Sequence, residues 1–175
     1  MSITLPEVKV VFADGGVRVR GGASLIEGVG IRPAFVIPDA RGRLGSILRC
    51  DDPWFDQLGQ VYFSTAYPGV VKAWHCHRKQ TNFFYVIQGA AKIGLHDVRD
   101  GSPTRGEVNE LVLSEHSPGL LRIPPGVQHG WMCVSTVEAI VLNLSDRPYN
   151  ADQPDDFRSP PHDNEIPFDW TVRDA

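Results

Sequence analysis

The chain has 175 residues, of which 42% are hydrophobic and 22% are charged, and its formal net charge is −4. This length suits one domain with its own hydrophobic core, and the composition is that of an ordinary globular protein. Because phosphate contacts need clustered Lys and Arg, and the basic residues here are scattered, we expect no nucleic-acid partner. We therefore predict a single domain over residues 1–175.

The cysteines and the N-terminus indicate the compartment. Cys50, Cys76 and Cys133 are odd in number and show no CxxC spacing, which favours a reducing environment. The first residues lack a basic region followed by a long apolar run, so no signal peptide is predicted. No segment approaches the roughly 18 continuous apolar residues of a spanning helix. We expect a cytoplasmic protein without a membrane partner.

Glycine and proline divide the chain into short segments, most of which are typical of strands. Several alternate apolar and polar residues or are rich in β-branched and aromatic residues. A short helix is predicted at Pro53–Gly59. The predicted strands, in chain order, are Val8–Phe12, Val17–Arg20, Ala34–Ile37, Gln60–Ala66, Val70–His77, Phe83–Ile87, Ala91–Leu95, Glu110–Leu113, Leu120–Ile123 and Val137–Leu144. This pattern predicts an all-β fold, best matched by a two-sheet jelly roll.

The last part of the chain, residues 148–175, differs from the rest. It is polar and rich in proline and turn-forming residues. Ile166, Phe168 and Trp170 nevertheless alternate with polar residues, which indicates that the segment packs back onto the body. We predict a mostly irregular C-terminal flap over a core of about residues 30–147.

Two histidines stand out in the predicted strand at Val70–His77. His75 and His77 are two residues apart, so their side chains point to the same face. Buried imidazoles need hydrogen-bond partners, so two of them facing one apolar interior are unusual as core filling. A solvated face is the alternative. A third histidine, His129, follows the proline-glycine turn of IPPGVQHGW.

These two stretches resemble the paired motifs of the cupin superfamily. The second motif, Pro-x-Gly-x-x-His, is met by residues 124–129. Asn82 stands where the first motif usually has glutamate. The residues at first-motif spacing are Gly69, His75, His77, Asn82 and Gly89. The resemblance implies a double-stranded β-helix, which is a form of jelly roll, with the motifs lining the barrel mouth.

The histidines allow two kinds of chemistry. In metal-binding cupins these positions hold an ion, and imidazoles suit zinc, iron, copper and nickel, so His75, His77 and His129 would be the ligands. Asn82, however, is a neutral and weak replacement for the carboxylate. Without metal, a histidine can remove a proton next to a ketone if the enolate oxygen is stabilised. We predict no cofactor, with the three-histidine metal site as an alternative.

Over most of its length the chain also resembles the dTDP-4-keto-6-deoxyglucose 3,5-epimerase family. Asp39-Ala-Arg41-Gly42 looks like the motif whose arginine contacts the nucleotide diphosphate. Gly69-VVKAWHC places His75 at the catalytic base, and IPPGVQHGW places His129 in the substrate pocket. The ending HDNEIPFDW resembles the family's C-terminal motif, whose aspartate pairs with the base and matches Asp163. The resemblance therefore implies a His75–Asp163 dyad.

The chain departs from this family at several functional positions. The family's catalytic tyrosine matches Asn143, which cannot act as an acid, whereas a downstream family tyrosine is retained as Tyr149. An arginine three residues before the base becomes Lys72, which keeps the charge and loses the bidentate fork. Simple alternation would turn Lys72 away from the His75 face, so its role requires a bulge or a twist. Gln60 matches a contact to the nucleotide base by position only.

The resemblance implies an epimerase that acts beside the C4 ketone of a dTDP-4-keto-6-deoxyhexose, at one or two carbons. His75 would remove the proton, and Lys72 or His129 would stabilise the enolate. Tyr149, His77 or water would return a proton to the other face. The predicted substrate-binding residues are Arg41, Gln60, Lys72, His77, Asn82, His129 and Asn143.

Other readings stay open. Nucleotide-sugar 3,4-ketoisomerases are cupins with an H-x-H pair similar to His75-Cys-His77 and have no need of the missing tyrosine. A metal-dependent cupin is a second alternative. A non-catalytic sugar-nucleotide binder is a third, because Asn82 and Asn143 replace reactive groups. Leu44 and Ser46 replace an aromatic and a glutamate near the nucleotide, so the base need not be thymine. The epimerase resemblance further implies a homodimer and a role in deoxysugar supply for polysaccharide.

Overall fold

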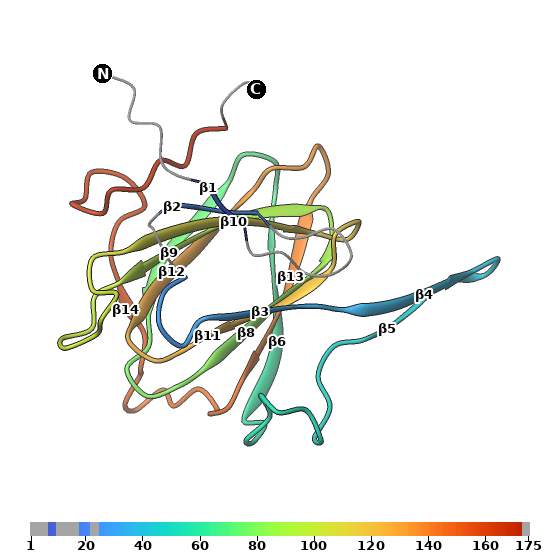
Figure 1. Cartoon of the computed structure of the whole chain (residues 1–175), viewed down its shortest axis with the longest axis horizontal. Helices are drawn as coiled ribbons and strands as arrows, with labels where there is room; N and C mark the ends of the chain where they lie inside the picture. The colour runs from blue at the N-terminus through green and yellow to red at the C-terminus, as the bar shows by residue number, and fades with distance from the viewer. Residues whose placement is uncertain (1–6, 10–17, 22–24, 173–175) are drawn as a thin grey trace.

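The computed structural model describes residues 7–9, 18–21 and 25–172, and it contains strands and no helix within these ranges (Figure 1). All strand pairs are antiparallel. The seven-stranded sheet has the order β1 (Glu7–Lys9), β2 (Arg18–Gly21), β10 (Val108–Ser114), β9 (Ala90–Asp97), β12 (Val127–Cys133), β7 (Val71–Cys76), β14 (Phe157–Arg158). The five-stranded sheet has the order β3 (Gly30–Pro33), β11 (Gly119–Ile123), β8 (Asn82–Gln88), β13 (Ala139–Ser145), β6 (Gln60–Ala66).

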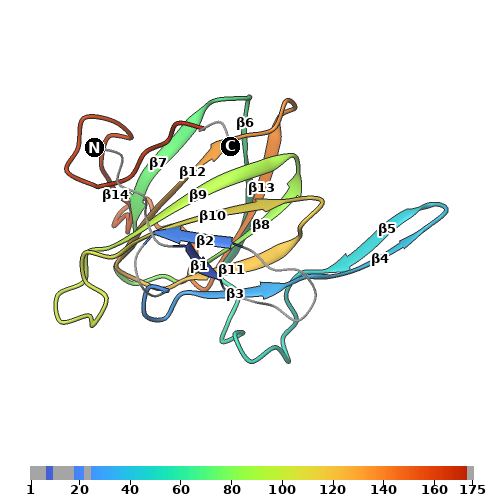
Figure 2. The same ribbon diagram turned by 45° about the horizontal axis from the view of Figure 1, so that its top comes forward.

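The two sheets face each other, so the predicted all-β jelly roll is confirmed (Figure 2). A separate two-stranded ribbon, β4 (Phe35–Asp39) and β5 (Gly42–Ser46), projects from this body in both views (Figures 1 and 2). Within the described ranges no helix is long and apolar enough to cross a membrane. Parts of the two predicted N-terminal strands, residues 10–12 and 17, lie outside the described residues.

The helix predicted at Pro53–Gly59 is wrong, because this segment forms turns and bends. A seven-residue helix is too short to be stable without strong tertiary packing. Packing here favours another conformation: Trp54 lies so close to Gly30 that a Cβ there would meet its ring at 2.6 Å. The ribbon strand β5, with every residue exposed, and the two-residue strand β14 have no periodic signal and were not among the predicted strands.

The hydrophobic core lies between the sheets and is built by alternation along the strands. Ala91, Ile93 and Leu95 of β9 are buried, and so are Leu111 and Leu113 of β10. Polar side chains replace this apolar layer on the inner faces of β6, β7 and β13. The hydrophobic layer therefore leaves one region between the sheets for a polar site.

The C-terminal segment packs on the outside of the seven-stranded sheet, as its apolar alternation predicts. The Trp74 ring lies 5.3 Å from that of Phe168 and 5.0 Å from that of Trp170, measured between centroids. The Lys92 ammonium donates to the backbone carbonyls of Asp169 (2.6 Å) and Thr171 (3.0 Å). These contacts hold residues 168–171 against β7 and β9.

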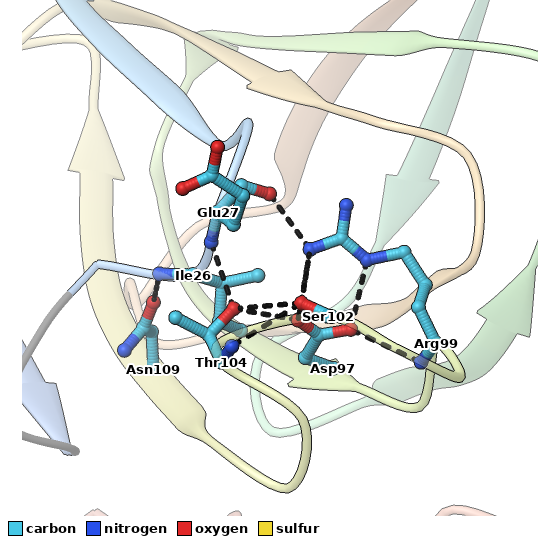
Figure 3. A network of polar contacts seen from close by, with 7 residues as sticks. All are labelled: Ile26, Glu27, Asp97, Arg99, Ser102, Thr104 and Asn109. Atoms are coloured by element: carbon cyan, nitrogen blue, oxygen red, sulfur yellow. Dashed lines mark hydrogen bonds and ion pairs between the residues drawn. The ribbon is translucent and has the colours of Figure 1, made fainter.

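A buried carboxylate ties the loop after β9 to the chain before β3. Asp97 is fully buried and accepts hydrogen bonds from Arg99 (2.8 Å), Ser102 (2.6 Å) and Thr104 (2.6 Å) (Figure 3). Arg99 also donates to the Glu27 carbonyl at 2.7 Å, and the Glu27 amide donates to Thr104 at 2.9 Å. Burial opposes ionisation, but the bonds from Arg99, Ser102 and Thr104 outweigh it and hold the pKa of Asp97 well below its usual value.

We expect Asp97→Asn to lower the free energy of unfolding by about 3 kcal/mol at pH 7, because it leaves Arg99 partly buried without its partner. The pKa of Asp97 is lower in the folded than in the unfolded chain. Its contribution is therefore complete above the unfolded value of about 3.9 and is lost as the pH falls further. Urea denaturation at pH 7 and pH 3 should show the difference from wild type shrinking in acid. Asp100→Asn, in the same loop but exposed, is the matched control, and an equal loss in both variants would contradict the prediction.

Candidate active site

A cavity of ≈ 630 Å³ opens between the two sheets. Its wall is formed by β6, β7, β12, β13 and the segment of residues 147–158. The structure brings together here seven of the residues predicted for the site: Gln60, Lys72, His75, His77, His129, Asn143 and Tyr149. The cavity is large enough for a ligand of metabolite size.

A β-bulge places Lys72 and His75 on the same wall. His75 pairs with His129 and Lys72 pairs with Trp131, so β7 advances three residues while β12 advances two. The extra residue reverses the alternation of side chains along β7. Lys72 therefore faces the same side as His75, which simple alternation would not allow. Gly130 lies at the bulge, where a Cβ would come within 2.2 Å of a β7 side chain. Both Lys72 and His75 consequently line the cavity.

His75 has an ionised carboxylate beside it. Its Nδ1 lies 3.1 Å from Oδ1 of Asp156, and Arg158 donates to the other oxygen of Asp156 through Nε (2.8 Å) and Nη2 (2.7 Å). Burial raises the pKa of Asp156, but the hydrogen bonds from Arg158 and His75 outweigh it and hold this pKa below the usual value. The carboxylate keeps a proton on Nδ1 of His75, which leaves Nε2 free to accept one.

His77 is fixed by the residue next to this carboxylate. Its Nδ1–H donates to the backbone carbonyl of Asp155. The Asp155 side chain accepts the backbone N–H groups of Arg78 (2.9 Å) and Lys79 (2.8 Å). Residues 155 and 156 therefore orient both histidines of the H-x-H pair.

His129 is buried and neutral. Its Nδ1–H donates to the Val127 carbonyl at 3.0 Å, and its Nε2 accepts from the Asn82 amide at 3.3 Å. Burial, reinforced by the nearby His77, lowers the pKa of His129 to about 3. The Asn82 oxygen accepts in turn from Gln80 at 2.9 Å. Since both ring nitrogens are occupied, His129 has no N–H group left for a ligand.

Three predicted site residues are not in the cavity wall. Arg41 is at the turn of the β4–β5 ribbon, where its side chain is 90% exposed and pairs with Asp39. Asn82 lies behind His129 and acts on that ring. Asp163 is exposed in a loop beyond β14, with a φ of 56°, and does not take the place predicted for it beside His75. Antiparallel pairing of β14 with β7 brings Asp156 there instead.

The structure adds residues to the site that the sequence reasoning missed. Tyr62 shares the inward face of β6 with Gln60 and Ser64, a period-two pattern that could have identified it. The others have no comparable signal, because the loop after β7 and the non-periodic segment of residues 147–158 supply them. They are Lys79, Arg147, Asp155, Asp156 and Arg158.

The described residues do not form the metal site that the alternative with His75, His77 and His129 as ligands would need. Across the described ranges, no group of three or more His, Cys, Asp or Glu side chains is arranged to hold an ion. Use of His129 as a ligand through Nε2 would also require the loss of its contact with Asn82.

A jelly roll whose paired motifs place three histidines beside an interior cavity is a cupin. Residues 37–157 match the polysaccharide biosynthesis C-terminal domain family, and the chain belongs to that family. It is 36% identical over 148 residues to the spore coat polysaccharide biosynthesis protein SpsL of Bacillus subtilis (strain 168), covering 85% of this chain and 98% of the relative. It is 35% identical to the probable low-salt glycan biosynthesis epimerase Agl13 of Haloferax volcanii, covering 84% and 96%.

Solved structures agree with this assignment. A dTDP sugar isomerase from Desulfovibrio desulfuricans G20 is 36% identical with a TM-score of 0.80, covering 85% of this chain and 94% of that one. The dTDP-4-dehydrorhamnose 3,5-epimerase of Bacillus anthracis shares the fold, with a TM-score of 0.76 at 22% identity over 89% and 92% of the chains. The resemblance to the 3,5-epimerases is thus confirmed.

The buried, neutral His129 predicts a pH dependence of stability. Its pKa is about 3 when folded, whereas an unperturbed histidine has about 6.5, so the unfolded chain binds more protons between these values. Stability should fall as the pH drops below 6.5, by up to about 1.4 kcal/mol per pH unit from this residue.

Urea denaturation between pH 7 and pH 5 checks this expectation. His129→Gln should flatten the decline, whereas His116→Gln, at an exposed position, should leave it unchanged. An undiminished slope in His129→Gln would show that the residue is protonated in the folded state.

Proposed function

We propose that the protein epimerises carbons adjacent to the C4 ketone of a nucleotide-linked 4-keto-6-deoxyhexose, with dTDP-4-keto-6-deoxyglucose as the first substrate to test. It is an enzyme of the isomerase class. The observation that carries the proposal is the His75–Asp156 pair in the cavity wall, in a chain whose relatives include sugar epimerases and isomerases. A positioned histidine can remove a proton beside a ketone near neutral pH.

His75 is the base in this reaction. Its Nε2 accepts the proton from the carbon, and the electron pair of the C–H bond moves onto the ketone oxygen. Asp156 then stabilises the imidazolium. Lys72 stabilises the enolate oxygen, because its ammonium donates to Ser64 at 3.0 Å and retains further N–H groups. His129 cannot serve in this way, since its one N–H is bound to Val127.

The nucleotide diphosphate has cationic side chains available at the cavity wall. Lys79, Arg147 and Arg158 line it, and charge-assisted bonds to phosphate are strong. Gln60 uses its oxygen to accept the Tyr149 amide at 2.7 Å, which leaves its NH₂ group for the nucleotide base. Cationic side chains for the diphosphate and a free amide for the base together support a nucleotide-sugar ligand.

We further propose a homodimer in which the β4–β5 ribbon contacts a second copy. Phe35 and Leu44 on the ribbon are 73% and 71% exposed. Val61 and Phe63 are exposed on the outer face of the edge strand β6 and offer the partner an apolar surface. Arg41, at the ribbon's turn, would then reach the partner's nucleotide.

The relatives and the free cysteines support a pathway and a compartment for the protein. Relatives of the chain act in spore coat polysaccharide and glycan biosynthesis, which supports a role in deoxysugar supply. Cys50, Cys76 and Cys133 are free, and this favours the reducing cytoplasm.

Proton exchange in heavy water tests the base. Incubation with dTDP-4-keto-6-deoxyglucose should place deuterium at C3, C5 or both, as read by NMR, and His75→Ala should abolish it. Asp156→Asn should slow the exchange by about 100-fold or more, because an amide cannot stabilise the imidazolium. Asp163→Asn is the matched control and should exchange at the wild-type rate. Full exchange in His75→Ala would end the assignment.

Light scattering of the eluting protein tests the dimer. Wild type should have twice the 19.3 kDa mass of one chain, and the double variant Phe35→Ser, Leu44→Ser should elute as a monomer. Val137→Ser removes an exposed apolar side chain outside the ribbon and should remain dimeric. A monomeric wild type would contradict the proposed assembly.

A further inference from the structure

Two polar side chains from neighbouring strands meet in the cavity wall opposite the bulge. Tyr62 of β6 and Asn143 of β13 stand directly across from each other in the register, so their side chains lie on the same face. The Asn143 amide donates to the Tyr62 hydroxyl at 2.6 Å. Tyr62 keeps 39% of its surface accessible, whereas Asn143 is only 5% exposed. Both line the cavity.

The pair has hydrogen-bonding capacity that the described part of the chain leaves unused. The buried Oδ1 of Asn143 has no partner among the described residues. Because the Tyr62 oxygen accepts from Asn143, its own proton is available to a ligand. Burial raises the pKa of Tyr62, and the negative charge of Asp156 adds to the effect, so the phenol is protonated at neutral pH. Unused polar groups in a cavity wall point to a ligand that completes them.

The pair and the base lie in different sheets. Tyr62 and Asn143 are on the five-stranded sheet, and His75 is on the seven-stranded sheet that faces it. The bond from Lys72 to Ser64 joins β7 to β6 across the same cavity, two residues along β6 from Tyr62. A sugar bound between the sheets would then have His75 on one face and Tyr62 on the other, which is what inversion at carbon requires.

We propose that Tyr62 is the acid that returns a proton to the face opposite His75, and that Asn143 positions it. This assignment rests on the proposed epimerase function and deepens it. The enolate collapses to the ketone as its α-carbon takes the Tyr62 proton: a C–H bond forms, the phenol O–H bond breaks, and the Asn143 amide stabilises the phenolate. Proton exchange with water then restores neutral His75 and protonated Tyr62.

The other donors in the wall fit this task less well. Tyr149 is 63% exposed, and the hydrogen bond that it donates to Gln60 comes from its backbone amide and not from its hydroxyl. The Nδ1–H of His77 donates to the backbone carbonyl of Asp155 and is therefore not available to a substrate. Asn143 has no acidic proton, so the phenol that its amide holds is the acid of the pair.

The variant Tyr62→Phe distinguishes removal of the proton by His75 from inversion of the carbon. In heavy water with dTDP-4-keto-6-deoxyglucose, the variant should still exchange protons near the wild-type rate, because His75 takes the proton and returns deuterium to the same face. The epimerised product should fall by about 100-fold or more, because the acid is gone. Tyr67→Phe, at an exposed tyrosine that is not in the cavity wall, is the matched control and should retain both activities. Inversion at the wild-type rate in Tyr62→Phe would overturn the proposal.

Asn143→Leu tests the positioning role. The ratio of inverted product to exchanged substrate should fall in this variant, and loss of folded protein alone would not change that ratio. An unchanged ratio would remove Asn143 from the mechanism. Absence of exchange in wild type would defeat the proposed function itself, whereas exchange with inversion in wild type and in Tyr62→Phe would defeat only the Tyr62 assignment.

Discussion

The site depends on the antiparallel pairing of the C-terminal flap with β7. Trp74 and Ser159 exchange backbone hydrogen bonds of 2.9 and 3.0 Å, and the pairing continues through Arg158 opposite His75. This ladder extends the sheet by one short strand and brings residues 155 and 156 to His75 of β7 and to His77, which directly follows β7. The Trp74 ring anchors Phe168 and Trp170 on the other face. One strand thus carries His75, the proposed base, into the cavity wall and binds the flap that orients it.

The local environment of each ionisable group in the cavity sets its protonation state. Asp156 is ionised because Arg158 and His75 outweigh its burial, and His129 is neutral because burial and nearby His77 oppose its charge. Tyr62 keeps its proton because burial and the charge of Asp156 disfavour a phenolate. In the proposed mechanism a base, a cation and an acid are therefore available together near neutral pH. In this mechanism Tyr62 on β6 supplies the phenol that the 3,5-epimerase family carries at the position of Asn143 on the adjacent strand β13.

Seven of the residues predicted for the site line the cavity, whereas the carboxylate beside His75 was not predicted. His75 and His129 lie in paired strands and His77 directly follows β7, so the spacing of the motifs carries over into space. Asp163 matched the family's aspartate by its distance from Trp170 along the chain. The position of an irregular flap is set by its contacts with the sheet, however, and the pairing of β14 with β7 places Asp156 beside His75.

The sequence by itself determined the strand-rich architecture, the cupin motifs and the histidine wall, because alternation and glycine-proline turns are local signals. It also showed that Lys72 needs a bulge or a twist to join His75. Only the tertiary structure decided where that bulge lies, which carboxylate meets His75, that residues 53–59 form no helix, and that Tyr62 contacts Asn143. Each of these depends on cross-strand register or on packing between segments far apart in the chain, and neither is encoded in local periodicity.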